Sequence, residues 1–288
     1  MPNWNSCWQP NTRSGNNWLP DRVVLVAEAN ARQSYPQLKA MNYRAYASIY
    51  HAAGQATFGA TLARTILDHL PRPQRVLDLA CGTGAAALVF AAGGATVVGV
   101  DCSPDMLRIA QSEAMQRGLA VEWIEADIRS LPSDSRLAPA SFDLCTCLFD
   151  SLNQLLDDTD LATVCRQAGT LLRPGGHFIF DLNTPAGLRS WQEYDQVTFD
   201  GRDLIVINRL TFDPSQQRAY GRIVWFRREG QRWWRGEETH CERPWDEGEI
   251  AAALAAGGLV LVARLTPQWL PATTDEPRIV YVATRPVG

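Results

Sequence analysis

Val76-Leu-Asp-Leu-Ala-Cys-Gly-Thr-Gly84 is the stretch of this sequence that decides the fold. Apolar residues surround one carboxylate, Asp78, and the run ends in a glycine turn that leads into an alanine-rich segment, 85–92. A buried strand that ends in glycine and opens directly into a helix places bare backbone at the carboxyl edge of a sheet, where open α/β folds bind ligands. Because Asp78 would repel a pyrophosphate, the stretch favours a cationic ligand at this edge.

Composition and charge exclude several classes of protein. With 288 residues and a net charge of −4, the chain lacks the basic balance of a nucleic-acid-binding protein. It contains no apolar run of membrane-spanning length, and residues 1–30 lack the pattern of a signal peptide. Seven cysteines without a CxxC pair and four histidines without HxxxH or HxH spacing predict reduced core thiols and no metal site. We therefore expect a cytoplasmic protein that binds neither nucleic acid nor membrane.

From residue 75 onward the chain alternates predicted strands and helices, which is typical of a doubly wound, mostly parallel sheet. An apolar stripe predicts a helix at 58–70, and Ser103 followed by Pro104 predicts the beginning of another that ends at Gly118. A further helix is expected at 159–172, followed by a turn at 173–176. The seven predicted strands of this sheet cover 75–80, 96–101, 121–126, 142–149, 177–182, 259–265 and 278–284.

The pattern changes after residue 195. Four segments alternate apolar and polar residues and are joined by turn signals, which predicts an antiparallel β insertion with strands at 196–200, 203–212, 219–228 and 232–243. A helix that begins at Asp246, with Glu249 completing a capping box, then returns the chain to the main fold. We expect an N-terminal arm (1–40), an α/β domain (41–194) completed by 245–288, and an insertion (195–244) that acts as a cap.

Three aspartates lie at successive predicted strands: Asp78 in the first, Asp101 at the end of the second and Asp127 after the third. In a parallel sheet all three line one rim of the ligand cleft. Asp101 can accept hydrogen bonds from both hydroxyls of a ribose, Asp127 and the backbone amide of Ile128 can bind the edge of an adenine, and Asp78 can help to hold an ammonium group. Together they describe a ligand with an adenine, a ribose and a cationic amino-acid tail.

The chain closely resembles the class I S-adenosylmethionine-dependent methyltransferases through five ordered motifs, at 76–84, 97–107, 126–128, 142–143 and 172–178. The resemblance extends over about 40–190. It implies a Rossmann-like fold, S-adenosyl-L-methionine as cofactor, and a final strand that lies antiparallel beside the fifth. It also implies the residues that contact the cofactor: Tyr50, Asp78, Ala80, Cys81, Gly82, Asp101, Cys102, Met106, Asp127, Ile128 and Leu148.

The resemblance also suggests where the methyl acceptor binds. Ala47-Ser-Ile-Tyr50 is similar to a helix that folds over the cofactor in small-molecule members of the family, although His51 stands where the family has an aspartate. Tyr50 could close the site or simply pack within the helix. The sequence lacks the Asn/Asp-Pro-Pro-Tyr/Phe loop that binds planar amides in nucleic-acid and glutamine methyltransferases. Its absence favours a small-molecule acceptor. Its expected contacts are Phe149, Asn153, Glu238 and His240.

A methyl group on a sulfonium is already activated, so the protein must chiefly align the nucleophile and exclude water. A general base is needed only where an N or O nucleophile arrives protonated. The candidates are His240, Tyr50, Asp150 and Glu238. Glu238 and His240 share one face of the last insertion strand, but His240 could equally be a structural histidine at the sheet edge.

Two other functions fit parts of the sequence. A non-catalytic S-adenosylmethionine-binding regulatory subunit would keep the cofactor residues without transferring a methyl group. An NAD(P)-dependent oxidoreductase would use Gly82-Thr-Gly84-x-x-Ala87 as a loose GxGxxA motif with Asp101 as the ribose acid. That interpretation places Asp78 beside a pyrophosphate and gives Asp127 no role. The sequence defines neither the acceptor nor the oligomeric state.

Overall fold

The computed structural model describes residues 46–191 and 194–288, all of which belong to one compact unit of the chain, Leu38–Gly288. The expected N-terminal arm, 1–40, lies outside the described residues. Among the helices that are described, none is both long enough and apolar enough to cross a membrane.

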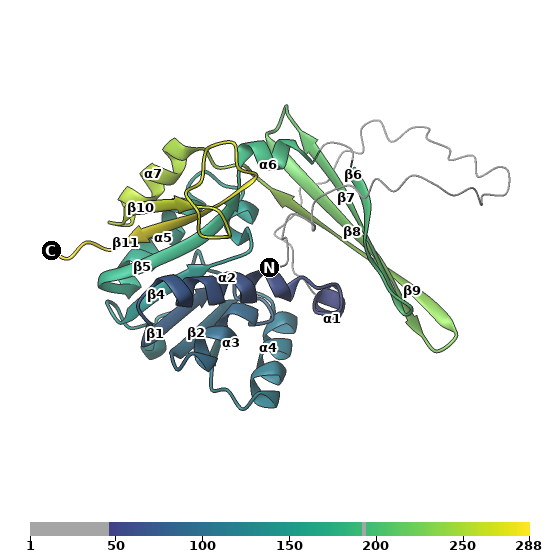
Figure 1. Ribbon diagram of the computed structural model, residues 1–288, viewed down its shortest axis with the longest axis horizontal. Helices are drawn as coiled ribbons and strands as arrows, with labels where there is room; N and C mark the ends of the chain where they lie inside the picture. Colours follow the sequence, from purple (N-terminus) through teal and green to yellow (C-terminus); the bar gives the residue numbers. More distant parts are fainter. Residues whose placement is uncertain (1–45, 192–193) are drawn as a thin grey trace. The chain divides into compact units, whose positions relative to one another are not determined.

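Seven strands form the main sheet, in the order β10-β11-β5-β4-β1-β2-β3 (Figure 1). Strands β1 to β5 run parallel, and β11 lies antiparallel between β5 and β10. This topology confirms the predicted doubly wound sheet and the antiparallel final strand beside the fifth. The strands are β1 (Arg75–Leu79), β2 (Thr96–Asp101), β3 (Glu122–Glu125), β4 (Phe142–Cys147), β5 (Leu172–Asn183), β10 (Val260–Leu265) and β11 (Arg278–Thr284).

Helices cover both faces of the main sheet (Figure 1). Side chains of a strand alternate between faces, so Val76 of β1 packs in the core formed with α2 and α3, whereas Leu77 and Leu79 pack in the core formed with α5 and α7. Asp78 shares the face of Val76, and its carboxylate is therefore buried beside α3. The helices are α2 (Ala56–His69), α3 (Ala85–Ala92), α4 (Pro104–Gln116), α5 (Asp160–Leu171) and α7 (Glu247–Ala256).

Local capping explains where two of these helices begin. Ser103 Oγ accepts a hydrogen bond from the backbone N–H of Met106 at the beginning of α4, and Asp246 and Glu249 form the predicted capping box of α7. The structure adds short elements that the sequence pattern did not predict: α6 (Pro185–Arg189) and 3-10 turns at Ser135–Leu137 and Ser151–Gln154.

Strand β5 begins five residues earlier than predicted, at Leu172 instead of 177, so the expectation of a separate turn at 173–176 was wrong. Gly175 has a φ of +79°, and the register between β4 and β5 shifts beside this segment. The backbone N–H of Gly175 donates to Arg285 O, and that of Arg285 donates to Gly176 O. The glycines therefore form an irregular beginning of the strand, held by the C-terminal end of β11.

The insertion forms a four-stranded antiparallel sheet with the order β6-β7-β8-β9, as predicted. Its strands are β6 (Tyr194–Asp200), β7 (Leu204–Asp213), β8 (Arg218–Glu229) and β9 (Arg232–Glu242). One face packs against Tyr46 and Ile49 at the short helix α1 (Ala47–Tyr50) through Val206, Ile223 and Trp225. We call this the inner face; by register it also carries Asn208, Leu210, Ala219, Gly221, Gly236, Glu238, His240 and Glu242.

Candidate functional site

The loop between β1 and α3 adopts an unusual backbone that is anchored to β2. Ala80, Gly82 and Gly84 all have positive φ values, of 52°, 53° and 77°. The backbone N–H of Cys81 donates to Val100 O at 3.0 Å, and that of Gly82 donates to Asp101 Oδ2 at 2.8 Å. Apart from Gly82 and its two chain neighbours, no atom of residues 46–191 and 194–288 lies within 4 Å of the position that a Cβ on Gly82 would occupy. The loop thus presents bare backbone to open space, as the glycine pattern predicted.

Asp78 is a buried carboxylate whose two oxygens differ in their hydrogen bonds. The residue is 2% exposed, and Thr146 of the neighbouring strand β4 donates to Oδ1 at 2.7 Å. Oδ2 is buried and has no hydrogen-bond partner among the residues that the structure describes. Burial raises the pKa of Asp78 to about 7, although the hydrogen bond from Thr146 opposes that rise. An acceptor atom left in this state is suited to a cationic ligand at the same loop.

Asp101 and Asp127 line the same edge but differ in environment. Asp101 is 8% exposed and accepts hydrogen bonds from the backbone N–H groups of Gly82 and Ser103, while burial raises its pKa. Asp127 is half exposed, and Arg129 binds both of its carboxylate oxygens. These hydrogen bonds lower the pKa of Asp127. Arg129 also pairs with Asp160. The role of Asp127 toward an adenine stays a prediction.

The other residues expected along this rim are distributed between core and surface. Met106 and Ile128 are buried, Leu148 belongs to the core formed with α2 and α3, and Cys102 is exposed. Although the residue is exposed, partial loss of water around the thiol raises the pKa of Cys102 to about 11, and the charges of Asp101 and Asp127 add to the effect. Each of the six described cysteines is a free thiol. Among the described residues, no group of three or more His, Cys, Asp or Glu side chains is arranged to hold a metal ion.

A second polar centre lies where β4 and β5 end. Phe149 and Asp150 both have positive φ values, of 63° and 51°, a strained conformation for residues with a Cβ. Asp181, fully buried in β5, accepts hydrogen bonds from the backbone N–H groups of both residues, at 2.6 and 3.1 Å. Arg278 of β11 bridges the carboxylates of Asp150 and Asp181. The ion pairs therefore hold the strained turn in place.

Aromatic rings close over this turn. The ring of Phe149 stacks on that of Phe58 of α2 with centroids 5.1 Å apart, and the Arg278 guanidinium lies 4.8 Å from the centroid of the Phe58 ring. The predicted substrate contact Phe149 is thus fixed from three sides, by Asp181, Arg278 and Phe58.

The polar centre continues into β9 of the insertion. Asn183 Nδ2 donates both to Asp150 Oδ2 at 2.8 Å and to Glu242 Oε2 at 2.9 Å. Glu242 Oε1 lies 3.4 Å from His240 Nε2, and the edge of the Trp191 ring approaches the imidazole. Burial raises the pKa of Glu242, and the charge of Asp150 adds to that rise. The sheet edge and the insertion therefore share one connected network, which we call the Asp150–His240 cluster (Asp150, Asp181, Asn183, His240, Glu242 and Arg278).

His240 lies flat against the strand beside it. A Cβ on Gly221, its partner in β8, would come within 2.3 Å of the His240 ring. The imidazole is 14% exposed, and Nδ1 is buried without a hydrogen-bond partner in the part of the chain that the structure describes. Because Nε2 faces the Glu242 carboxylate, the neutral ring favours a proton on Nε2 and a lone pair on Nδ1.

Asn153, predicted to contact the substrate, is fully buried and instead connects backbone segments. Its Nδ2 donates to Asn183 O and Arg243 O, and its Oδ1 accepts from the Asn183 N–H. Asn153 therefore ties the ends of β5 and β9 to the 3-10 turn Ser151–Gln154. Its amide is bound to backbone groups on both sides, which argues against a direct ligand contact.

Tyr50 and Glu238 lie on the α1 side of the inner face. The Tyr50 ring meets the edge of the buried Tyr46 ring at 5.7 Å, and burial together with the charge of Glu238 raises the pKa of Tyr46. His51, which replaces the family's aspartate, lies 4.0 Å from Glu113 of α4. Tyr50 as a catalytic residue stays a prediction.

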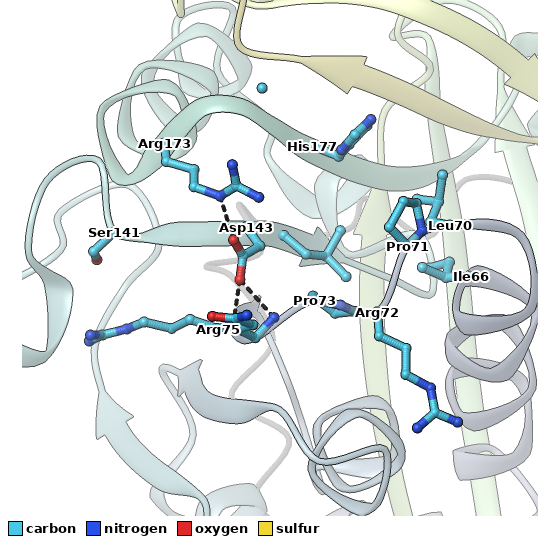
Figure 2. A pocket seen from close by; sticks show the side chains of 13 residues that line it. Ile66, Leu70, Pro71, Arg72, Pro73, Arg75, Ser141, Asp143, Arg173 and His177 are labelled. Carbon is cyan, nitrogen blue, oxygen red and sulfur yellow. Dashed lines mark hydrogen bonds and ion pairs between the residues drawn. The ribbon is translucent and has the colours of Figure 1, made fainter. Parts of the chain in front are cut away.

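A cavity of about 590 Å³ opens at the other edge of the main sheet, near the amino ends of β1, β4 and β5 (Figure 2). Asp143 stands inside it, but its carboxylate is already satisfied. Oδ2 accepts from the backbone N–H groups of Gln74 and Arg75 at 2.7 Å each, and Oδ1 accepts from Arg173. The Asp143 part of the motif at 142–143 thus joins three strands, away from the edge that carries the three aspartates.

The sequence pattern missed several residues of the Asp150–His240 cluster: Asp181, Asn183, Glu242 and Arg278. One signal was available for the first two, because Asp181 and Asn183 end a buried strand at the same edge as Asp101. Glu242 lies two residues from His240 and so shares its face. Arg278 carried no such signal, because its place depends on the antiparallel register between β11 and β5.

Comparison with known proteins bears on this geometry. The family described as a methyltransferase domain matches residues 76–176, which include the β1–α3 loop, Asp101 and Asp127. A crystal structure of an S-adenosylmethionine-dependent methyltransferase from Clostridium acetobutylicum superposes with a TM-score of 0.72 at 26% identity, covering 85% of this chain and 99% of that one. Residues 76–176 thus form a methyltransferase domain, and the chain has the fold of a class I S-adenosylmethionine-dependent methyltransferase. Its cofactor is S-adenosylmethionine.

Two curated relatives of this methyltransferase have names that describe different acceptors, an oxygen in one and an N-terminus in the other. The ubiquinone biosynthesis O-methyltransferase of Ralstonia nicotianae is 36% identical over 108 residues, which are 37% of this chain and 42% of that protein. The cypemycin N-terminal methyltransferase of a Streptomyces species is 33% identical over 162 residues, 55% of this chain and 63% of that protein. The methyltransferase thus spans less than two thirds of each of these relatives.

The β1–α3 edge fits the cofactor by its own chemistry. The unpartnered Oδ2 of Asp78 would face the positively charged amino-acid end, the open space at Gly82 would allow close approach, and Asp101 would bind the ribose. The cofactor supplies a methyl group that is activated by its positively charged sulfur. This fit disfavours the alternative interpretation, in which the same loop binds the dinucleotide of an NAD(P)-dependent oxidoreductase.

Asp101→Asn is expected to weaken binding of S-adenosylmethionine by about 10- to 100-fold, because a charge-assisted hydrogen bond contributes about 1.5–3 kcal/mol. Isothermal titration calorimetry with the cofactor measures the change. Asp68→Asn, an exposed carboxylate on α2, is the matched control and should keep the wild-type affinity. Unchanged affinity in Asp101→Asn would remove the ribose assignment.

Proposed function

We propose that this methyltransferase transfers the methyl group of S-adenosylmethionine to an N or O nucleophile of a small-molecule acceptor by in-line displacement. The observation that supports this proposal is the continuity of β4. Thr146 of β4 binds Asp78 at the cofactor loop, and Asp150, only four residues further on, belongs to the Asp150–His240 cluster. Four residues span at most about 14 Å, so the cofactor edge and the cluster are within reach of a single small acceptor.

The protein's contribution to the reaction is positioning and removal of a proton. Arg278 and Asp181 hold the Phe149–Asp150 turn, which would form one wall for the acceptor. Alignment of a nucleophile with the reacting bond can contribute about 7–11 kcal/mol. His240 would act as the general base through Nδ1, with Glu242 fixing the tautomer and the orientation of the ring.

The insertion would act as the cap of the acceptor site. Its inner face brings His240 and Glu242 into hydrogen-bonded contact with the end of the main sheet through Asn183. The acidic charge of the chain favours a small acceptor over a nucleic acid. Free thiols at all six described cysteines favour a reducing compartment, and we propose a cytoplasmic location.

Transfer of a labelled methyl group is the direct test of this function. The purified chain is incubated with methyl-labelled S-adenosylmethionine and a panel of small amines, phenols and carboxylic acids, and products are separated and counted. Label in an acceptor supports the proposal. The alternative, a non-catalytic cofactor-binding subunit, predicts calorimetric binding of the cofactor with no transfer to any acceptor even at high protein concentration.

His240→Gln is expected to lower kcat with the true acceptor by about 100-fold while leaving cofactor affinity within about twofold of wild type. The reason is that the glutamine amide can fill the space beside Gly221 but cannot accept the acceptor's proton at neutral pH. Steady-state kinetics and calorimetry separate the two effects. Full turnover in the variant would show that His240 is only a structural residue of the sheet.

A further inference from the structure

The cavity near the amino ends of β1, β4 and β5 has no part in the function proposed above (Figure 2). Its volume of about 590 Å³ lies within the range of pockets that bind small organic molecules. It lies at the opposite end of β1 from the β1–α3 loop, and this strand of five residues separates them by about 16 Å. A ligand in this cavity would therefore not compete with the cofactor.

One side of the cavity is apolar. Ile66 of α2 and Leu144 of β4 line it and are buried, and Leu70 at the C-terminal end of α2 is half-buried beside them. Pro71 and Pro73 extend this side along the segment between α2 and β1. The cavity thus offers a surface for the hydrocarbon part of a ligand.

The opposite side carries a guanidinium that is fixed in place. Arg173 Nε donates to Asp143 Oδ1, and Asp143 is itself held by the backbone N–H groups of Gln74 and Arg75. In the part of the chain that the structure describes, Nη1 and Nη2 of Arg173 make no hydrogen bond. These two groups form the end of a planar fork, whose N–H donors match the two oxygens of a carboxylate.

His177 places a second donor near Arg173. Its imidazole is half-buried and makes no hydrogen bond within residues 46–191 and 194–288. Burial lowers the pKa of His177, and the charge of Arg173 lowers it further. The ring is therefore neutral at pH 7 and keeps one N–H donor. The influence of Arg173 on this pKa also indicates a positive potential at the histidine.

Positive charge prevails among the groups that line the cavity. Asp143 is the only carboxylate among the described lining residues, and it is paired with Arg173. Arg75 also lines the cavity, but its guanidinium already donates to Arg136 O. Arg72, exposed at the rim, has no ion pair with another described residue. The lining therefore favours an anion.

We propose that this cavity binds a small organic acid, with its carboxylate against Arg173 and His177 and its apolar body against Ile66, Leu70 and Leu144. The C-terminal end of α2 carries the partial negative charge of the helix, so the carboxylate belongs on the side of β5. Inorganic phosphate would match the guanidinium but would leave the apolar side uncovered. The site goes beyond methyl transfer, because it shares no residue with the cofactor loop or the Asp150–His240 cluster.

The four histidines of the chain allow a bound acid to be located. Protein with isotope-labelled histidine, saturated with S-adenosylhomocysteine, is titrated at pH 7 and constant ionic strength with phenylacetate, and the imidazole signals are followed by NMR. The signal of His177 is assigned from His177→Gln. We expect phenylacetate to move this signal to saturation, and the uncharged 2-phenylethanol to leave it in place. Movement of the His240 signal alone, an equal response to the alcohol, or no movement would overturn the proposal.

Two smaller anions distinguish an organic acid from a general anion. Inorganic phosphate and acetate carry oxygens for Arg173 but lack the apolar body, so each should bind at least about 10-fold more weakly than phenylacetate. The same NMR titration measures their affinities. Phosphate or acetate that binds as tightly as phenylacetate would overturn the assignment to an acid with an apolar body.

Arginine variants test the contact by calorimetry. Arg173→Gln should weaken phenylacetate binding by at least about 10-fold, because a charge-assisted hydrogen bond is lost. Arg117→Gln is the matched control, since Arg117 is similarly exposed and also pairs with one carboxylate, Glu113; it should keep the wild-type affinity. Arg72→Glu should weaken binding by at least about threefold through its charge alone.

The affinity for S-adenosylhomocysteine shows whether each variant is folded, and it should stay at the wild-type value in all three. Arg72→Glu changes an exposed side chain and so keeps the test decisive if Arg173→Gln does not fold. Wild-type affinity for phenylacetate in folded Arg173→Gln, or in Arg72→Glu where Arg173→Gln does not fold, would refute the site.

Discussion

Gly82→Val is expected to reduce the affinity for S-adenosylmethionine by at least about 1,000-fold while the protein stays folded. The valine side chain would occupy the open space beside the loop, where, apart from the chain neighbours of Gly82, no described atom lies within 4 Å of the Cβ position. The change therefore creates no clash within the protein but fills the place where the cofactor would approach the backbone. Loss of several hydrogen bonds and of close packing at about 1–1.5 kcal/mol each accounts for an effect of this size.

A second glycine separates this effect from backbone strain. Gly82 has a φ of +53°, so valine also strains the loop, by about 1–3 kcal/mol. Gly118, beyond the C-terminal end of α4, has a φ of +64° and equally open surroundings. Gly118→Val should show a similar loss of melting temperature with wild-type cofactor affinity. Tight cofactor binding by Gly82→Val would refute the role of the loop.

The main fold could be predicted from the sequence because its pattern is local. Strands β2 and β11 and helix α3 occupy the predicted ranges without change, and the other boundaries of the main sheet, apart from the beginning of β5, differ by at most two residues. Buried parallel strands produce short apolar runs, and the caps at Ser103 and Asp246 mark helix beginnings, so each element is defined by a few adjacent residues. The beginning of β5 was the exception, because glycines that normally signal a turn form a bulged strand when another strand holds them.

The site was predictable only where function depends on adjacent residues. The glycine loop, Asp78 and Asp101 lie at the ends of strands that follow one another, so strand topology alone brings them together. The Asp150–His240 cluster joins residues from 150 to 278 and depends on two contacts between distant segments, which the pattern of adjacent residues does not reveal. One is the register of β11 against β5, which places Arg278. The other is the contact of β9 with the end of β5 through Asn183.

Asp78→Asn is expected to stabilise the cofactor-free protein at pH 8 by up to about 4 kcal/mol and to have little effect near pH 4. Burial raises the pKa of Asp78 to about 7, against about 3.9 in the unfolded chain. Between these values the folded state holds one more proton than the unfolded state, so stability falls as pH rises toward 7. About three pKa units at 1.36 kcal/mol each give the estimate. Asparagine resembles the protonated acid and escapes this loss.

Urea denaturation at pH 4.5 and pH 8 without cofactor measures the stability change. The difference between Asp78→Asn and wild type should grow between the two pH values. An equal difference at both would show that the carboxylate does not titrate in this range. Asp101 is also buried, and its charge adds to the raised pKa of Asp78, so the comparison reports Asp78 together with its interaction with Asp101.

Cofactor binding should respond in the opposite sense to stability. The ionised Asp78 would attract the positively charged amino-acid end of the cofactor through Oδ2, so wild-type affinity should rise as pH increases through about 7. Asp78→Asn should bind the cofactor about 10- to 100-fold more weakly at pH 8 and lose most of this pH dependence. Calorimetry at pH 6 and pH 8 is the measurement. A variant that is more stable yet binds the cofactor more weakly would show that the buried carboxylate favours cofactor binding and lowers the stability of the fold. Unchanged affinity would show that Asp78 is a core residue without a role in binding.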